Sequence, residues 1–264
     1  MPHIDQHFAS QLRELKDRLV AMGGRCEHLM SGALSAIESG DVELADEVMA
    51  RDAAIDADEV ALDALAVRIL ARRQPMGRDL RLIVATLKVV RHLEQIGDEA
   101  VNLAERTARL SAGRPGLNHA LALLPDMGAR CARMLSGSLD AFVGADEARA
   151  HQVLEMDDDV DALYEEALRR GVAFMRAHPQ LAEAGMAYTS GAKYLERIAD
   201  LCTNIAEMVV FMVEGVDVRH GAFRADGAEP SRSRGASPPS SSPRTSEKPR
   251  IALRANDFAS FPQE

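Results

Sequence analysis

Apolar residues recur every three or four positions along most of the chain between residues 8 and 215, which is the spacing of one helical face. One such stripe precedes an acidic stretch in the first half: Leu80, Ile83, Leu87 and Val90. A second stripe lies near the end of the second half: Leu195, Ile198, Cys202 and Ile205. The pattern predicts a chain of long amphipathic helices.

Breaks in this pattern divide the first half into three predicted helices, over about residues 8–38, 41–73 and 79–110. Ser39 and Gly40 end the first helix, and Asp41 is placed to cap the second. Pro75 lies in the Gln-Pro-Met-Gly stretch that ends the second helix, because proline removes a backbone donor. We expect Asp79 to cap the third helix.

The second half repeats this plan. Its first helix is predicted to begin near Leu117 and to break near Gly144 and Asp146. The next helix stops at Pro179, and the last one ends near Gly215. Long helices joined by short connections pack as antiparallel neighbours, so each half is predicted to be a three-helix bundle.

An internal duplication relates the two halves. A shift of 105 residues superposes a cysteine and two aspartates of the first half on their equivalents in the second: Cys26 on Cys131, Asp52 on Asp157 and Asp56 on Asp161. Near the end of each half the shift becomes 102 and superposes a further polar set: Glu94, Asp98 and Asn102 on Glu196, Asp200 and Asn204. Chance similarity between Ala- and Leu-rich helices would hardly keep one register across cysteine and acidic positions together.

Composition supports the same fold class. Apolar residues make up 47% of the 264 residues but aromatic residues only 4%, whereas strand-rich domains usually carry more aromatic side chains. We therefore predict an all-α protein of two tandem homologous three-helix bundles, over residues 1–112 and 113–221. Residues 222–264 form a predicted tail whose stretch 229–249 is rich in Ser, Pro, Arg and Lys, so we expect it to be disordered.

Net charge, apolar runs and cysteine content limit the partners and the cellular compartment that we expect for this protein. The net charge of −10 disfavours nucleic acid as a partner and suits metal cations or basic protein surfaces. The chain starts without a basic segment followed by an apolar run, and its apolar runs are too short to span a bilayer. Three scattered cysteines do not form a disulfide framework. We expect a cytoplasmic protein without membrane insertion.

The candidate chemistry lies in the repeated motif Glu-x-x-x-Asp-x-x-x-Asn. A spacing of four puts Glu94, Asp98 and Asn102 one turn apart on the same helix face, and Glu196, Asp200 and Asn204 repeat the arrangement. Two neighbouring carboxylates repel each other, and a bridging cation would offset that repulsion, with the Asn carbonyl as a neutral ligand.

The preceding helix of each half carries a second pair of acids at the same spacing, Asp52 with Asp56 and Asp157 with Asp161. If the two helices lie antiparallel, four carboxylates converge in each bundle, in an all-oxygen site suited to Mg, Mn, Ca or Fe. Acidic pairs are also common on solvated helix faces. Glu196 and Asp200 lie away from the apolar stripe of their helix, and we expect that pair to look more like such a face.

Catalytic groups are not evident. No histidine follows a glutamate at the spacing used by di-iron carboxylate bundles, and no cysteine has a visible base. We expect a protein that binds partners and is not an enzyme. A metal-dependent, carboxylate-bridged enzyme and a helical scaffold without metal stay open as alternatives.

The order of several motifs resembles the PhoU family of phosphate regulators. The first half carries Arg73-Gln74-Pro75, Asp79-Leu80-Arg81 and Glu94-Gln95-Ile96-Gly97-Asp98. The second half carries Glu196-Arg197-Ile198-Ala199-Asp200 with Asn204, and then Gly215-Val216-Asp217-Val218-Arg219-His220. The resemblance covers about residues 5–221. Gln95 stands where the family often has Arg, and Ala199 where it often has Gly.

The resemblance implies a negative regulator of phosphate uptake and of the phosphate-starvation response. Such a regulator links a phosphate ABC transporter, through its ATPase subunit, to a membrane sensor histidine kinase. The resemblance also implies a homodimer and metal ions, with Fe, Mn, Mg or Zn bound at the repeated carboxylate motifs. The tail lies outside the family pattern.

Overall fold

The computed structural model describes residues 2–112 and 123–215, and every regular element within these ranges is a helix. The first half contains α1 (Pro2–Ser39), α2 (Val42–Ala50), α3 (Ala53–Arg73), α4 (Gly77–Ala104) and α5 (Thr107–Ala112). The second half contains α7 (Leu123–Gly144), α8 (Glu147–Glu155), α9 (Asp157–Ala177), the short 3₁₀ helix η1 (Pro179–Leu181) and α10 (Ala182–Glu214).

The predicted all-α fold with two repeats is confirmed. The predicted tail, 222–264, and the predicted helix start at Leu117 lie outside the described residues, so these expectations stay predictions, as do the domain boundaries at 112 and 221. No helix in the described part of the chain is long and apolar enough to cross a membrane.

Equivalent aspartates begin the second helical segment of each half. Asp41 Oδ1 accepts a hydrogen bond of 3.0 Å from the backbone N–H of Leu44, and Asp146 Oδ1 accepts one of 3.0 Å from that of Arg149. Each carboxylate satisfies an amide that the helix itself leaves without a partner. The predicted cap at Asp41 and the predicted break near Asp146 are therefore confirmed.

Three predicted helices are wrong in detail, because each is broken by a turn; in the second half, the helix predicted to run from Asp146 to Pro179 divides into α8 and α9 at Met156. The segment 41–73 divides into α2 and α3 at Arg51 and Asp52, and the segment 79–110 divides into α4 and α5 after Ala104. At the first turn, the N–H of Arg51 bonds to the carbonyl of Val48 three residues back. A straight helix would place Asp52 in line with the buried Val48. The chain therefore changes direction at Asp52. The period of the apolar residues alone does not reveal this turn.

The predicted cap at Asp79 is also wrong. α4 begins at Gly77 with Met76 as its N-cap residue, and Asp79 lies within the first turn. Gly77 has a φ of 57°, so the chain reverses at a position that favours glycine, two residues earlier than expected. An acidic side chain in the first turn still interacts favourably with the helix dipole.

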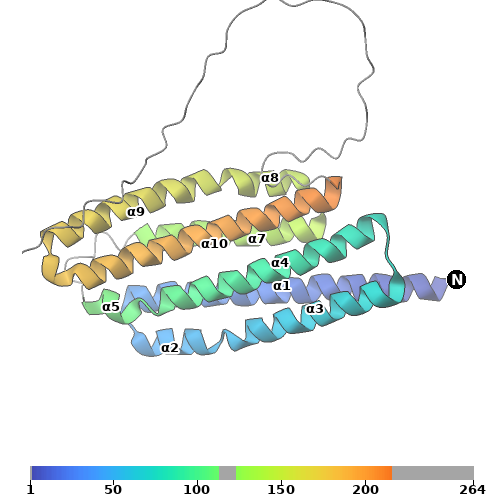
Figure 1. Cartoon of the computed structure of the whole chain (residues 1–264), viewed down its shortest axis with the longest axis horizontal. Helices are drawn as coiled ribbons and strands as arrows, with labels where there is room; N and C mark the ends of the chain where they lie inside the picture. Colours follow the sequence, from blue (N-terminus) through green and yellow to red (C-terminus); the bar gives the residue numbers. More distant parts are fainter. Residues whose placement is uncertain (1, 113–122, 216–264) are drawn as a thin grey trace, which may run out of the picture. The chain divides into compact units, whose positions relative to one another are not determined.

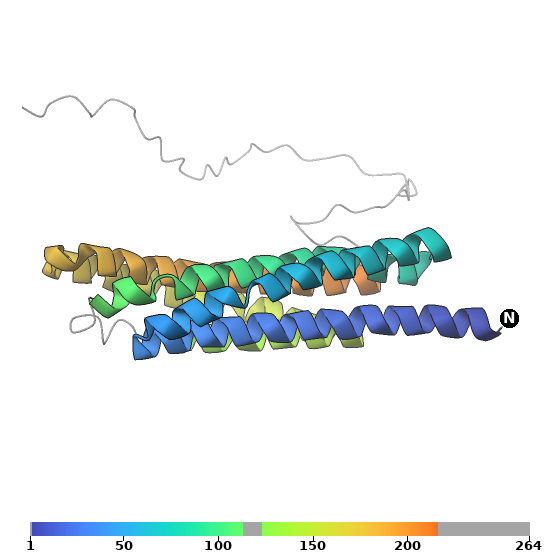
Figure 2. The ribbon, with the colours of Figure 1, turned by 90° about the horizontal axis from the view of Figure 1, so that it is seen from below.

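Four long helices form the inside of the molecule. α4 packs against α10 and α1 against α7 across the two halves, while α1 with α4 and α7 with α10 pack within each half. α3 lies on the outer side of α4, and α9 on the outer side of α10 (Figures 1 and 2). The described helices thus belong to one compact unit in which the two repeats share their inner faces.

The contact between α1 and α7 repeats the duplication in three dimensions. A Cβ atom at Gly23 of α1 would overlap the side chain of Leu139 on α7, and one at Gly128 of α7 would overlap Leu34 on α1. Both pairs are related by the shift of 105 residues. Each leucine therefore fits against a glycine of the other half, and this allows the two helices to approach closely.

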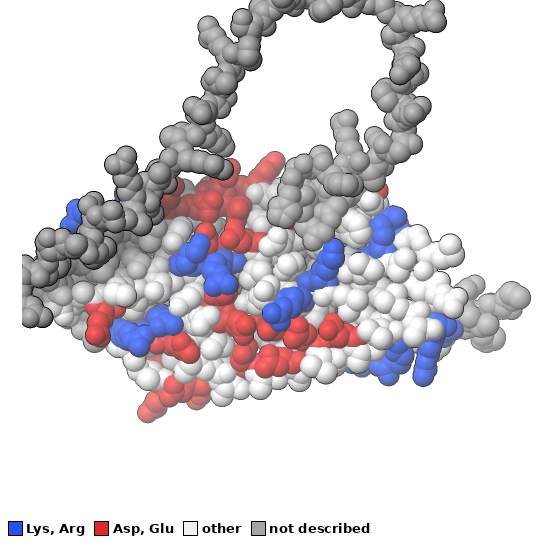
Figure 3. Space-filling view, in the orientation of Figure 1, with Lys and Arg blue, Asp and Glu red and all other residues white. Residues whose placement is uncertain are grey.

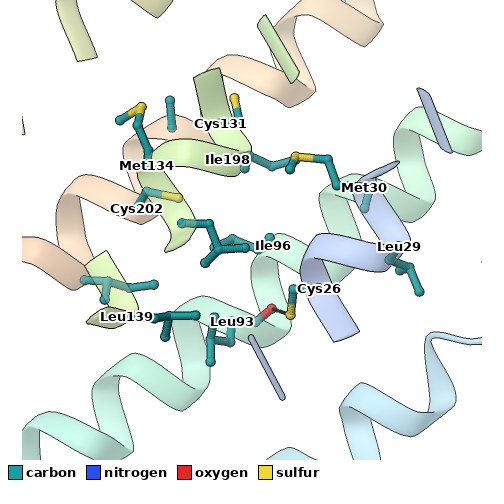
Figure 4. Packing of buried hydrophobic residues seen from close by; sticks show 14 of the residues in the cluster. Cys26, Leu29, Met30, Leu93, Ile96, Cys131, Met134, Leu139, Ile198 and Cys202 are labelled. Carbon is teal, nitrogen blue, oxygen red and sulfur yellow. Dashed lines mark hydrogen bonds between the residues drawn. The ribbon is translucent and has the colours of Figure 1, made fainter. Parts of the chain in front are cut away.

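The three cysteines lie in the core (Figure 4). Cys26 Sγ donates a 3.2 Å hydrogen bond to the carbonyl of Leu93, and Cys131 Sγ donates an equivalent 3.2 Å bond to Leu195. Burial raises the pKa of both thiols to about 12. These thiols stay protonated at neutral pH, as expected of small core residues.

Candidate functional site

The predicted acids of the first half come together on the outer face formed by α3 and α4. Asp52 precedes α3 and makes no capping bond with its carboxylate, and Asp56 follows in the first turn. Glu94 and Asp98 lie on α4, which runs antiparallel to α3. A Cβ atom at Gly97 would lie 3.1 Å from Asp52 Oδ1, so this glycine leaves room for the carboxylate beside α4.

These acids interact electrostatically, because the negative charge of one raises the pKa of another. Burial raises the pKa of Asp52, and the charges of Asp56 and Asp98 raise it further. Burial likewise raises the pKa of Glu94, with additional contributions from Asp98 and from Glu59. Each carboxylate is thus harder to ionise because its neighbours are also negative.

Two residues of this group were not predicted. Glu59 lies on α3, one turn after Asp56, and Arg91 on α4 binds both Glu94 at 2.8 Å and Glu59 at 3.6 Å. Spacing along α3 offered a signal for Glu59, because residues three apart share a face. Arg91 lies three residues before Glu94 and partly neutralises the group.

The acids of the second half form the equivalent group on α9 and α10. The carboxyl of Asp157 has a pKa raised to about 6, first by burial and then by Asp161 and Asp200, with a smaller contribution from Glu196. The pKa of Asp200 is also raised, first by burial and then by Glu196. Asp157 Oδ1 is buried and has no hydrogen-bond partner in the described part of the chain. This group is therefore the more strained of the two.

The expected difference between the halves is wrong. We expected Glu196 and Asp200 to lie on a solvated face, but the side chain of Glu196 is only 14% exposed, against 13% for Glu94, and Asp200 is exposed just as its equivalent Asp98 is. Lys193 binds Glu196 at 2.6 Å and takes the place that Arg91 has beside Glu94. The apolar stripe of α10 by itself did not show that α9 covers this glutamate.

The two asparagines of the motif differ in their contacts. Asn102 Nδ2 donates a 3.5 Å hydrogen bond to Glu99 Oε2, which leaves its carbonyl oxygen as an acceptor. Asn204 is half-buried on α10. Glu99 itself is buried and binds Arg197 of α10 at 2.9 Å. This ion pair between the halves was not predicted, because its members lie on helices that the sequence does not place side by side.

The donor set fits a hard cation in its chemistry, but the side chains do not converge on one point. Within the described residues, no three His, Cys, Asp or Glu side chains are arranged so that they could hold a metal ion. Carboxylate oxygens are the ligands that such cations prefer, and the buried, unpartnered Asp157 Oδ1 is an atom that a cation would satisfy. Figure 3 shows acidic side chains gathered over α3 and α4 and, separately, towards α8 and α9. Binding would need new rotamers of these side chains.

Comparison with known proteins gives one family. The sequence model of the PhoU domain matches the chain twice, at residues 19–107 and 124–209. A phosphate-specific transport system accessory protein PhoU homolog from Pseudomonas putida is 37% identical over 233 residues, which is 86% of this chain and 88% of that protein. The PhoU accessory protein of Escherichia coli K12 is 33% identical over 220 residues, covering 83% of this chain and 90% of that protein.

Solved structures agree with these sequence matches. The crystal structure of PhoU from Pseudomonas aeruginosa superposes with a TM-score of 0.74 at 36% identity, over 79% of this chain and 99% of that one. The phosphate transport system regulatory protein PhoU from Streptococcus pneumoniae superposes with a TM-score of 0.73 at 26% identity, over 80% and 99%. The matches thus span both repeats.

Proposed function

The chain belongs to the PhoU family, and we propose that it acts as a negative regulator of phosphate uptake and of the phosphate-starvation response. The observation that carries this proposal is the pair of PhoU matches at residues 19–107 and 124–209. Relatives that the chain covers almost end to end are named as accessory proteins of the phosphate-specific transport system. A role in that system is the common element of their names.

We propose that the protein works in the cytoplasm by binding partners, and that it is not an enzyme. The partners are the ATPase subunit of a phosphate ABC transporter and a membrane sensor histidine kinase. The acidic side chains over α3 and α4 offer a surface for a basic patch, because complementary charges speed encounter and fix orientation. We further propose a homodimer, which sedimentation of the purified protein would test.

Metal ions are the second part of the proposal. Ions such as Fe, Mn, Mg or Zn would be held by the two acid groups, through Asp52, Asp56, Glu94 and Asp98 in one and Asp157, Asp161, Glu196 and Asp200 in the other. Bound cations would relieve the repulsion that raises the pKa of Asp52, Glu94 and Asp157. The carbonyl oxygens of Asn102 and Asn204 are candidate neutral ligands.

Elemental analysis after incubation with each metal tests this part. We expect more than one ion per chain, and the double replacement of Glu94 and Asp98 by Ala should lower that number while helicity stays unchanged. Replacing the exposed acids Asp46 and Glu47 of α2 gives a matched loss of charge outside both groups. If the unchanged protein, the Glu94/Asp98 variant and the Asp46/Glu47 control bind the same number of metal ions, or if none of them binds metal, the metal-binding part of the proposal is wrong.

A deletion strain tests the regulatory role. Without the protein, transporter and phosphatase genes of the starvation response should be expressed even at high phosphate. Complementation with the unchanged gene should restore repression. Unchanged expression in the deletion strain at both high and low phosphate would refute the regulatory assignment, and it would leave the metal prediction in place.

A further inference from the structure

A cationic cavity lies where the N-terminal part of α1 and the start of α4 meet the C-terminal ends of α7 and α10 (Figure 1). Its volume is about 360 Å³, and its charged lining comprises Arg13, Lys16, Arg78 and Asp79. Three cationic side chains against one carboxylate leave a net charge of +2 at pH 7. The whole chain carries a net charge of −10, so this concentration of positive charge is local.

Some of the cations at this end of the molecule are already engaged with helix ends. Lys16 Nζ donates a 3.0 Å hydrogen bond to the carbonyl of Val143 in the last turn of α7. Arg81 Nε, from the next turn of α4 after Arg78, donates a 3.2 Å bond to the carbonyl of Met212 near the end of α10. These two side chains offset the negative ends of two helix dipoles.

The other two cations have no such role. Arg13 and Arg78 are exposed, and neither forms a hydrogen bond or ion pair within the described ranges 2–112 and 123–215. They lie on different helices and face one cavity. A guanidinium presents its N–H donors as a planar fork, which matches the oxygens of a phosphate group.

Duplication does not account for this set of cations. The corresponding start of α10, from Ala182 to Ala192, contains no lysine or arginine, whereas the first turns of α4 contain Arg78 and Arg81. The second repeat folds without these charges. Arg78 is therefore not required by the three-helix plan itself, and neither is Arg13, which the shift of 105 residues superposes on Asn118.

We propose that the cationic cavity binds a doubly charged phosphate group, either as free phosphate or as a small phosphate monoester. The net charge of +2 matches that of the dianion, and Arg13 and Arg78 supply the donors. The remaining wall is apolar, with Leu12, Leu82 and Met212, and leaves room for the organic part of a monoester. A hollow of this volume suits a small molecule, since ligand pockets begin at roughly 300 Å³. This proposal does not depend on the regulatory role, because phosphate binding is measured on the purified protein alone.

Calorimetric titration of the full chain with inorganic phosphate and with glycerol 3-phosphate tests the proposal, at pH 8 and constant ionic strength set with chloride. We expect saturable binding of at least one of them with a Kd below about 1 mM. Tighter binding of inorganic phosphate identifies the free ion as the ligand class, and tighter binding of glycerol 3-phosphate identifies a monoester. Both results support the site.

Four variants locate the binding. Arg13→Gln and Arg78→Gln should each weaken it by roughly 10-fold to 100-fold, the effect of losing a charged hydrogen-bonding partner. Asp79→Asn should strengthen it about fivefold, because it removes the opposing charge, and a gain of affinity cannot come from misfolding. Arg133→Gln is the matched control, since Arg133 is an exposed arginine of α7 outside the cavity. No saturable binding of either probe, or equal weakening by Arg133→Gln, would overturn the proposal.

Discussion

Replacing Asp157 by Asn should stabilise the metal-free protein at pH 8, although it removes a candidate ligand. The pKa of Asp157 is raised from 3.8 to about 6, so its ionised form is unfavourable in the folded chain. A shift of this size corresponds to about 3 kcal/mol. The side chain is only half-buried, and its place in the first turn of α9 favours negative charge. We therefore expect about half of that value, roughly 1.5 kcal/mol.

The pH dependence has a definite sign. The folded-state pKa lies above the unfolded value, so the contribution of Asp157 to stability is fully present below about pH 4 and is lost as the pH rises through about 6. Asparagine does not ionise and keeps that contribution at all pH values. The difference between variant and unchanged protein should therefore be near zero at pH 4 and largest at pH 8.

Urea unfolding followed by circular dichroism, in the presence of a chelator, measures the two free energies of unfolding. Asp126→Asn is the matched control: Asp126 is an exposed carboxylate in the first turn of α7, outside both acid groups, so its loss should be neutral or slightly destabilising. If Asp157→Asn is no more stable than the unchanged protein at pH 8, or if its advantage is the same at pH 4 and pH 8, the repulsion argument is wrong. Added Mn²⁺ should favour the unchanged protein if the proposed metal site exists.

Three further changes test the fold. Arg197→Met leaves the buried carboxylate of Glu99 without its ion-pair partner and should cost about 2 kcal/mol at pH 8 in urea unfolding, less at pH 5 where Glu99 is more protonated. Asp146→Ala removes the N-cap of α8 and should lower the unfolding free energy by about 1 kcal/mol. Gly128→Val should cost about 1–3 kcal/mol through overlap with Leu34, and a second change, Leu34→Ala, should recover part of the loss in melting temperature.

Local rules predicted most of the fold. The apolar period, the glycines and prolines, and the two capping aspartates Asp41 and Asp146 gave the helices and most of their ends, because these features act over one or two turns. The turn at Asp52 was missed, because the residues around it are ordinary helix formers. A straight helix would place Asp52 in line with the buried Val48, and the apolar period does not show that the chain turns there.

The acid groups could be predicted only in part, because Glu59 of the first group and the surroundings of both groups were missed. Duplication identified the acids on α3 with α4 and on α9 with α10, and the charges of Asp161 and Asp200 raise the pKa of Asp157 beyond the effect of burial. The burial of Glu196 was missed, because the helical wheel of α10 contains no information about which helix covers each side. The ion pair of Glu99 with Arg197 was missed for the same reason, since its members are 98 residues apart.

Comparison of the two halves distinguishes the contacts that stabilise the bundle from the charged groups that stability does not explain. The glycine–leucine contacts of α1 with α7 and the thiol–carbonyl bonds of Cys26 and Cys131 occur in both repeats, as expected of features that hold the helices together. The acid groups also occur twice, yet repulsion makes them unfavourable for folding, so stability alone does not explain why both halves have them. Arg78 has no basic counterpart at the start of α10, and the shift of 105 residues superposes Arg13 on Asn118. The repeated acids thus support the proposed metal sites in both halves, whereas the arginines of the cationic cavity come from α1 and α4 of the first half.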